Sequence, residues 1–182
     1  SSPRQIYAYL KNYFNKKNIV KKKNWKAIVT SGPTREYIDP VRYISNESSG
    51  KQGYEIAIAL NKLGIATTLI AGPSNLISPK GIKVKKITSA DEMLSEVKKS
   101  LPADLAVCVA AVTDFKPVVK SKIKIKKENL NLNSINFVKN NDILEYICKH
   151  NKYRPRIVAG FSAETDNLIK NSINKMKRKH CD

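Results

Sequence analysis

Cysteine and histidine are scarce in this chain, and their spacing excludes several kinds of site. Three cysteines, Cys108, Cys148 and Cys181, and two histidines, His150 and His180, occur among 182 residues. The cysteine count is odd and no C-x-x-C pair occurs, so we expect neither a disulfide framework nor a zinc site, and a reducing compartment fits best. Neither histidine has a second ligand at metal-binding spacing. The sequence therefore identifies no metal ligands.

Long apolar runs are also missing. The longest, Leu105–Val112, is far shorter than the roughly 20 residues that a helix needs to cross a bilayer. The N-terminal residues lack the charged, apolar and small-residue regions of a signal peptide. We therefore expect a cytoplasmic chain that has no membrane contact.

Acidic residues are few, because 15 Asp and Glu stand against 34 Lys and Arg, which gives a net charge of +19. Such a charge is compatible with a polyanionic partner, so a basic nucleic-acid-binding domain is one open interpretation. Lysine is frequent along the whole chain, however, and no segment combines basic residues with interleaved aromatic residues on one helical face. We therefore favour a mostly solvated charge, with a local excess of lysine for a phosphate-bearing ligand, over a nucleic-acid partner.

The most informative stretch of the chain is polar. Residues Ser31–Gly53 have the sequence SGPTREYIDPVRYISNESSGKQG and follow an apolar run, Ala27–Val29. They lead into Tyr54–Leu63, which has helical periodicity. A strand, a polar turn and a helix in this order predict an anion site, because the first N–H groups of a helix are free to donate.

Backbone and hydroxyl groups are the expected donors at this site. Gly32 would let the main chain approach a ligand, the helix would begin near Gly50, and Thr34, Ser48 and Ser49 carry hydroxyls. The stretch contains neither G-x-G-x-x-G nor G-x-x-x-x-G-K-[ST], so it matches no general nucleotide signature. A dinucleotide-binding Rossmann module, of the NAD(P) type or without catalysis, is the alternative interpretation, although no acidic residue ends the second predicted strand.

Two blocks of the stretch are more specific. Residues Gly32–Asn46 and Ser48–Gly53 match G-P-T-R-E-x-x-D-P-V-R-Y-I-S-N and S-S-G-K-x-G almost letter for letter, and here the chain resembles phosphopantothenoylcysteine synthetase. The resemblance covers about Ala27–Asp182. It implies a ligase of coenzyme A biosynthesis that joins 4′-phosphopantothenate to cysteine, with CTP as co-substrate and Mg²⁺ as metal ion. It also implies a homodimer or a larger assembly.

The chain divides into residues 1–24 and a domain over residues 25–182. A Ser-Pro start and apolar residues at four-residue spacing predict a helix over Ser2–Asn15, followed by a basic linker, Lys16–Asn24. This helix is either the tail of an upstream decarboxylase domain, which in relatives binds FMN, or an independent helix that docks on the core. Because relatives continue with a further strand, we expect the domain to be incomplete beyond Asp182.

Short apolar runs alternate with helical segments in residues 25–182. The predicted strands after the first are Ala66–Ala71, Ile82–Ile87, Asp104–Ala110 and Ile157–Gly160. Ser89 and Glu92 predict a capping box at the start of one helix, and further helices are predicted over Asn141–His150 and Glu164–Lys179. This alternation predicts an α/β fold with a doubly wound, mostly parallel, Rossmann-like sheet.

Two segments in the second half of the chain depart from the simple alternation or have a predicted orientation. The pattern breaks at Asp114–Phe137, where alternation over Lys122–Lys127 and the apolar residues of Leu130–Phe137 predict an inserted β-hairpin flap. The cap of the helix that follows is expected at Asn140 or Asn141. In the last helix one face is expected to point inward, and its residues are Leu168, Ile169, Ser172, Ile173 and Met176.

The resemblance implies that two residues are catalytic. Asn46 would donate its amide to the acyl carbonyl, and Lys124 would contact the phosphates of the nucleotide. Lys122 is the rival because the Lys-Ile repeat leaves the register open, and an alternating lysine strand is also typical of a solvated sheet edge. The loops at the carboxyl ends of the strands would bind the nucleotide. Besides Lys124, this expected set comprises Gly32, Thr34, Ser48, Ser49, Gly50, Cys108, Val109, Ala110, Asp114, Asn141, Asp142, Ile143, Leu144, Phe161, Lys175 and Lys179. Asn141 stands where the family has proline.

Overall fold

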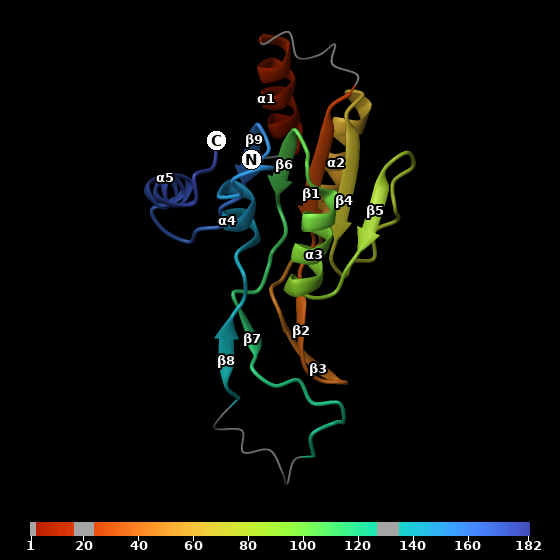
Figure 1. Ribbon diagram of the computed structural model, residues 1–182, viewed down its shortest axis with the longest axis vertical. Helices are drawn as coiled ribbons and strands as arrows, with labels where there is room; N and C mark the ends of the chain where they lie inside the picture. Colours follow the sequence, from red (N-terminus) through yellow and green to blue (C-terminus); the bar gives the residue numbers. More distant parts are fainter. Residues whose placement is uncertain (1–2, 17–23, 127–134) are drawn as a thin grey trace.

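A sheet of five parallel strands forms the centre of the molecule (Figure 1). The computed structural model describes residues 3–16, 24–126 and 135–182. The strand order is β5-β4-β1-β6-β9, and the strands are β1 (Lys26–Ser31), β4 (Ala66–Ala71), β5 (Lys83–Lys86), β6 (Leu105–Cys108) and β9 (Ile157–Gly160). From β1 the chain builds outward through β4 and β5 and then returns to build β6 and β9 on the other side. The predicted doubly wound parallel sheet is therefore confirmed.

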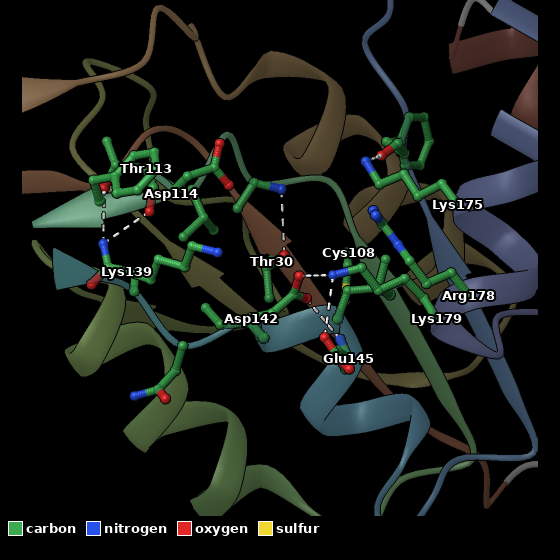
Figure 2. Close-up of a pocket in the computed structure, with 18 of the residues that line it drawn as sticks. Thr30, Cys108, Thr113, Asp114, Lys139, Asp142, Glu145, Lys175, Arg178 and Lys179 are labelled. Atoms are coloured by element: carbon green, nitrogen blue, oxygen red, sulfur yellow. Dashed lines mark hydrogen bonds and ion pairs between the residues drawn. The ribbon is translucent and has the colours of Figure 1, made fainter. Parts of the chain in front are cut away.

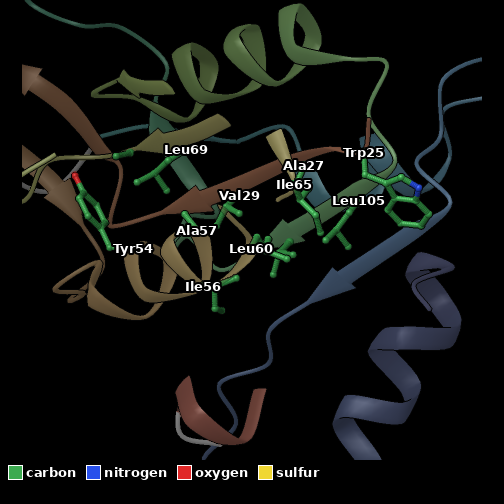
Figure 3. Close-up of a cluster of buried hydrophobic side chains, with 12 residues drawn as sticks. Trp25, Ala27, Val29, Tyr54, Ile56, Ala57, Leu60, Ile65, Leu69 and Leu105 are labelled. Atoms are coloured by element: carbon green, nitrogen blue, oxygen red, sulfur yellow. The ribbon is translucent and has the colours of Figure 1, made fainter. Parts of the chain in front are cut away.

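Helices cover both faces of the sheet. These helices are α2 (Lys51–Lys62) on one face and α3 (Ala90–Ser100) and α4 (Ile143–Cys148) on the other. Because side chains alternate along a strand, Ala27 and Val29 pack with the α2 residues Ala57 and Leu60 (Figure 3). Ile28 belongs instead to the cluster of α3 and α4. The capping box of α3 at Ser89 and Glu92 is confirmed.

Two glycines make the junction of β1 and α2 possible. Gly50, the N-cap of α2, has a φ of 73°, a conformation that other residues rarely adopt. A Cβ atom at Gly53 would lie 2.5 Å from the Cβ and Oγ atoms of Ser31. Ser31 Oγ in turn donates to the Gly50 carbonyl over 2.7 Å. The predicted helix start near Gly50 is confirmed, and the helix packs directly on the strand.

Two antiparallel hairpins project from the carboxyl ends of the parallel strands (Figure 1). The first pairs β2 (Arg35–Asp39) with β3 (Arg42–Ser45), and the second pairs β7 (Phe115–Pro117) with β8 (Phe137–Lys139). The second hairpin confirms the predicted insertion. The first was not expected, because we interpreted the whole polar stretch before α2 as a turn.

The lysine-rich part of the insertion is not a strand, which corrects the expectation for Lys122–Lys127. No strand is assigned over the described residues 118–126. Side chains hold this segment instead, since Asp39 accepts from the Ile125 N–H over 3.2 Å and Arg42 donates to the Ile125 carbonyl over 3.0 Å. The expected second arm over Leu130–Phe137 lies largely outside the described residues, and β8 begins at its last residue.

Helices α4 and α5 (Leu168–Lys179) both start later than predicted. The cap of α4 is Asp142, not Asn140 or Asn141, because the Asp142 carboxylate accepts from the Glu145 N–H over 2.8 Å. In α5 the expected inward face is wrong. Its apolar side chains are exposed, namely Leu168, Ile169, Ile173 and Met176.

The N-terminal helix α1 (Pro3–Lys16) packs against α2, and its Ile6 and Leu10 contact the core. This contact agrees with the interpretation of α1 as a helix that docks on the core. The predicted cap Ser2 and most of the predicted linker, residues 17–23, lie outside the described residues. Within the part of the chain that the structure describes, no helix has the length and apolarity to cross a membrane.

Candidate functional site

A cavity of about 830 Å³ opens at the carboxyl ends of β1, β6 and β9 (Figure 2). Thr30, Cys108 and Phe161 line it, and the sheet register pairs Thr30 with Cys108 and Cys108 with Gly160. Since β4 lies on one side of β1 and β6 on the other, the cavity is at the switch point of the sheet. Open α/β sheets bind their ligands at this position.

Backbone hydrogen bonds fix the inner end of the cavity. Val109 donates its N–H to the Thr30 carbonyl over 3.2 Å, and Ala110 donates to Thr30 Oγ1 over 3.3 Å. Phe161 donates to the Cys108 carbonyl over 3.2 Å. Burial raises the pKa of the Cys108 thiol to about 12, so this cysteine is a neutral packing group near neutral pH and no thiolate nucleophile.

Helix α5 supplies a cationic wall made of Lys175, Arg178 and Lys179 (Figure 2). Lys175 Nζ donates to the Phe161 carbonyl over 2.9 Å. Lys179 is 8% exposed and pairs with Asp142, while its Nζ lies 3.5 Å from a carboxylate oxygen of Glu145. Burial lowers the pKa of Lys179. This wall can donate to an anion that enters the cavity.

Four carboxylates also line the cavity, namely Asp114, Asp142, Glu145 and Glu164. Hard cations such as Mg²⁺ prefer oxygen ligands of this kind. Among the described residues, no three His, Cys, Asp or Glu side chains form a cluster that could hold a metal ion by themselves. A cation at this site would therefore need further oxygen ligands, such as waters, backbone carbonyls or phosphate oxygens.

A buried hydroxyl network centred on Thr113 connects the cavity to both hairpins. Thr113 Oγ1 lies 3.0 Å from Thr34 Oγ1 and 3.3 Å from a carboxylate oxygen of Glu36. The Thr113 N–H donates to Thr34 Oγ1 over 3.1 Å, and its carbonyl accepts from Asn140 Nδ2 over 2.8 Å. Thr34, Glu36 and Thr113 are all buried. The network therefore fixes Asp114, the next residue of the chain, against the first hairpin.

Asn46 and the loop before α2 form the rim beside this network. Asn46 is exposed, and its Nδ2 donates to the Val112 carbonyl over 3.0 Å, so its amide is anchored to a cavity-lining residue. Ser48 Oγ accepts from the Gly50 N–H over 3.3 Å, and Ser49 Oγ accepts from the Lys51 N–H over 3.4 Å. These hydroxyls thus lie at the N-terminus of α2, as the motif predicts.

Lys124 is exposed on the segment that precedes Ile125. The neighbouring Ile125 is held by Asp39 and Arg42, as described above, and the Arg42 side chain also holds the pKa of Asp39 well below its ordinary range. Lys122 is exposed as well and follows Ser121, whose N–H donates to the Ile38 carbonyl over 2.9 Å. Both lysines are therefore anchored to the first hairpin through a neighbouring residue.

The structure brings most of the expected nucleotide-binding residues into one place. The cavity lining includes Cys108, Ala110, Asp114, Asn141, Asp142, Ile143, Leu144, Phe161, Lys175 and Lys179. Outside the lining lie the residues of the rim and flap together with Val109, and these are Gly32, Thr34, Asn46, Ser48, Ser49, Gly50, Val109 and Lys124. Thr34 is fully buried, so it acts on the cavity through Thr113.

The loops Ala110–Asp114 and Phe161–Thr165 were expected at the site, but several lining residues were not expected individually. They are Thr30, Val112, Thr113, Phe115, Lys139, Asn140, Glu145, Glu164 and Arg178. Arg178 had a usable signal, because it lies three residues after Lys175 and thus on the same face of a helix. Thr30 could have been found from its place at the end of the first predicted strand. The contacts of Thr113 and Asn140 depend on tertiary structure and left no pattern in the sequence.

The fold and the cavity together define a doubly wound α/β protein with a charged cavity at the switch point of its sheet. Comparison with known proteins narrows this class. The family model of the DNA/pantothenate metabolism flavoprotein C-terminal domain matches residues 22–182, and the chain belongs to this family.

Curated relatives agree with this assignment. The Coenzyme A biosynthesis bifunctional protein CoaBC of Borreliella burgdorferi is 42% identical over 180 residues, which cover 98% of this chain and 45% of the relative. The protein of the same name from Haemophilus influenzae is 40% identical over 183 residues, covering 100% of this chain and 45% of the relative. The chain thus spans about 45% of the length of these relatives.

Solved structures show the same fold. The crystal structure of the C-terminal domain of a CoaBC protein has a TM-score of 0.74 and 32% sequence identity, over 86% of this chain and 74% of that chain. A Cab2 variant, solved in complex with phosphopantothenate-cysteine, has a TM-score of 0.69 over 98% of this chain and 77% of that chain. At 15% identity, the second likeness concerns the fold alone.

Proposed function

We propose that this chain is the part of a phosphopantothenate–cysteine ligase that binds the nucleotide and the acid. The cationic wall of Lys175, Arg178 and Lys179, at the carboxyl ends of parallel strands, carries this proposal. It suits a polyphosphate, while the anchored amide of Asn46 lies on the adjoining rim. The motif match of the rim and the names of the curated relatives support the same activity.

The reaction has two steps. The carboxylate of 4′-phosphopantothenate attacks the α-phosphorus of CTP, the bond to the β-phosphate oxygen breaks, and pyrophosphate leaves. The amine of cysteine then attacks the acyl carbon of the acyl-cytidylate, loses a proton, and displaces CMP. In such reactions most of the rate enhancement comes from positioning of the substrates and from stabilisation of charge. The proposed mechanism therefore needs neither a cysteine nucleophile nor a catalytic histidine, and Cys108 can stay neutral.

Each residue group has a distinct task in this proposal. Lys175, Arg178 and Lys179 bind the phosphates, and Lys124 from the flap closes over them. Phe161 packs near the base, and Asp114 offers its carboxylate either to the ribose hydroxyls or to a metal ion. Asn46 donates its amide to the acyl carbonyl when negative charge develops on that oxygen during attack by cysteine.

Mg²⁺ fits the donor set of this cavity. It binds readily through one or two carboxylates together with substrate phosphates, and it usually keeps several waters. Asp114 is the carboxylate that we propose would share the ion with the triphosphate. Bound there, the ion would neutralise charge on the phosphates. FMN, by contrast, would belong to a separate decarboxylase domain of a longer protein, as the word bifunctional in the relatives' names suggests.

We also propose that the chain works as a homodimer through its projecting hairpins. The hairpins and residues 118–126 carry exposed apolar side chains, which include Tyr43, Val119, Ile123 and Phe137. Exposed apolar side chains on neighbouring segments are typical of an interface when they form a common surface. A second copy packed there would lie next to the flap and the rim of the cavity.

Pyrophosphate release tests the proposed function. The chain is incubated with CTP or ATP and Mg²⁺, with and without 4′-phosphopantothenate, before any cysteine is added. We expect release that depends on the acid, faster with CTP than with ATP, followed by formation of the amide once cysteine is present. Heat-stabilisation by NAD⁺ but not by CTP, together with no release in any mixture, would favour the dinucleotide-binding alternative.

The two flap lysines are separated by parallel substitutions. Lys124→Gln is expected to lower the rate of CTP-dependent pyrophosphate release roughly 10-fold or more, because a charge-assisted hydrogen bond to phosphate contributes about 1.5–3 kcal/mol. Lys122→Gln serves as the matched control and should change the rate much less. The reverse order would assign the phosphate contact to Lys122.

A further inference from the structure

Two cysteines that lie 33 residues apart in the sequence meet at the end of the cavity wall. Cys148 ends α4 and Cys181 follows α5, and their Sγ atoms are 3.6 Å apart. Cys148 is buried and Cys181 is partly exposed. Their irregular spacing gave no sign of this contact. A disulfide has an S–S distance of about 2.05 Å, so a modest change of the two side chains would join them.

Arg154 holds the backbones of both cysteines in place. Its guanidinium donates to the Cys148 carbonyl over 3.1 Å and to the carbonyl of His180, next to Cys181, over 2.9 Å. The same group reaches the Asp182 carboxylate over 3.1 Å. One arginine therefore binds the end of α4 and the segment after α5 together. Because the backbones are already fixed, rotation of the side chains rather than refolding would bring the sulfur atoms into bonding distance.

The pair lies directly behind the residues that face the proposed nucleotide. Lys179 is two residues before Cys181 and pairs with Asp142 and Glu145, which belong to the start of α4. A polyphosphate that binds Lys179 competes with these two carboxylates for its ammonium group, and like charge favours a greater distance between carboxylates and phosphates. A covalent bond between the ends of α4 and α5 would oppose any such separation of the two helices.

We propose that Cys148 and Cys181 form a reversible disulfide that holds the ends of α4 and α5 together, keeps Lys179 paired with Asp142 and Glu145, and thereby weakens nucleotide binding. The oxidant is a small-molecule disulfide of the glutathione type. The partly exposed Cys181 thiolate attacks one sulfur of it and releases one thiol. Cys148 then loses its proton, attacks Cys181 Sγ, and releases the second thiol. Two protein thiols are oxidised and one disulfide is reduced to two thiols, so atoms and electrons balance.

The order of these steps follows from exposure. Burial, followed by the hydrogen bond with Cys181, raises the pKa of the Cys148 thiol to about 12, so this thiol is a poor first nucleophile. Cys181 has access to a small oxidant. Once the mixed disulfide has formed, Cys148 is the neighbouring thiol, and its attack is intramolecular. Cys108 packs against the same apolar cluster, but burial raises the pKa of its thiol to about 12, so we expect it to take no part.

Peptide mapping tests the bond itself and does not depend on the proposed function. The native chain is incubated with glutathione disulfide, free thiols are alkylated, and the digest is analysed by mass spectrometry. We expect a peptide pair joined through Cys148 and Cys181, lighter by two hydrogen atoms than the separate peptides, in the wild type and in Cys108→Ser. Cys148→Ser should instead carry a glutathione adduct at Cys181. Adducts or alkylated thiols in place of the joined peptides of the wild type would overturn the proposal.

The effect on the cavity is tested by CTP binding, and this part rests on the proposed function. In the bridged chain we expect the apparent Kd for CTP to rise about tenfold or more, the loss expected when one charge-assisted hydrogen bond is denied. Treatment with dithiothreitol should restore the original Kd. An equal Kd in both redox states would overturn the proposed coupling. Absence of CTP binding in the reduced chain would instead refute the nucleotide assignment, while the mapping would still decide whether the bridge forms.

Discussion

Single hydroxyl and amide groups determine where the charged residues of the cavity lie. Thr113 is 2% exposed, yet its side chain and backbone bind Thr34, Glu36 and Asn140. Asp114 follows it directly, and Asn140 precedes the residues that cap α4. A change at Thr113 is therefore transmitted to both sides of the cavity. The sequence motifs identified charged residues of the site, but they did not identify Thr113, which positions them.

Thr113→Val should raise the KM for CTP roughly 5- to 10-fold and change kcat less, because the hydroxyl positions binding groups and touches no reacting atom. Valine keeps the volume of threonine but leaves a carboxylate oxygen of Glu36 with one partner fewer. Steady-state kinetics at varied CTP concentration measure the effect. Thr113→Ser should restore most of the KM, since serine keeps the hydroxyl. Equal loss of kcat in both variants would contradict a positioning role.

Asn46→Ala should slow the cysteine-dependent step about 10²- to 10³-fold, the loss typical of one donor to a developing oxyanion. Pyrophosphate release before cysteine is added should change less, because the amide is assigned to the second step. Rapid-quench measurement of pyrophosphate and of the amide product separates the two rates. The exposed Asn75, in the loop after β4, provides the control Asn75→Ala. If both steps slowed equally, the assigned role of Asn46 would be wrong.

At the scale of elements, the apolar pattern predicted the five parallel strands because β1, β4 and β6 are largely buried between helices, while the edge strand β5 shows the alternation of a half-exposed strand. The hairpin of β2 and β3 was missed because its residues coincide with the motif that we interpreted as a turn. Its turn had a local signal, since Asp39 precedes a proline and its carboxylate accepts from the N–H groups of Val41 and Arg42, both over 2.9 Å. Residues 118–126 do not form the predicted strand. The ion pair of Asp39 and Arg42 binds the backbone of Ile125 in place of hydrogen bonds to a neighbouring strand.

The pair of Asp39 and Arg42 predicts how the flap contact depends on pH. The Arg42 side chain lowers the pKa of Asp39, so the folded-state pKa lies below the unfolded value of about 3.9. The carboxylate therefore contributes stability above that unfolded value and loses it as pH falls through the lower folded pKa. The difference in unfolding free energy between wild type and Asp39→Asn should be constant from about pH 5 upward and shrink below about pH 3.9.

Urea unfolding at a series of pH values measures this difference. Limited proteolysis at neutral pH should also cut Asp39→Asn faster at residues 118–126, because Ile125 loses part of its anchor. Glu47→Gln is a suitable control, since Glu47 is exposed at the loop before α2. A difference that stayed constant down to the most acidic pH at which the chain folds would show that Asp39 contributes nothing through its charge.

For the whole molecule, periodicity shows which residues share a face but not what covers that face. Helical spacing placed Leu168, Ile169 and Ile173 together correctly, and the expectation that they face a core was wrong because no other described element packs over them. The meeting of Cys148 and Cys181 likewise depends on how two distant segments fold together. Net charge could not locate the site either. It gives the sum of all charges and does not show which few of them form the cationic wall.

The exposed apolar side chains of the projecting hairpins and flap segment predict self-association. Val119 and Ile123 are each 76% exposed, and polar replacement of both should convert a dimer into a monomer because the interface loses apolar area. Sedimentation of wild type and of the Val119→Ser, Ile123→Ser double variant over a range of concentrations measures the mass. Ile77→Ser is the matched control, since Ile77 is 90% exposed in the loop between β4 and β5. This control should stay dimeric, and a wild type that sediments as a monomer at every concentration would refute the proposed assembly.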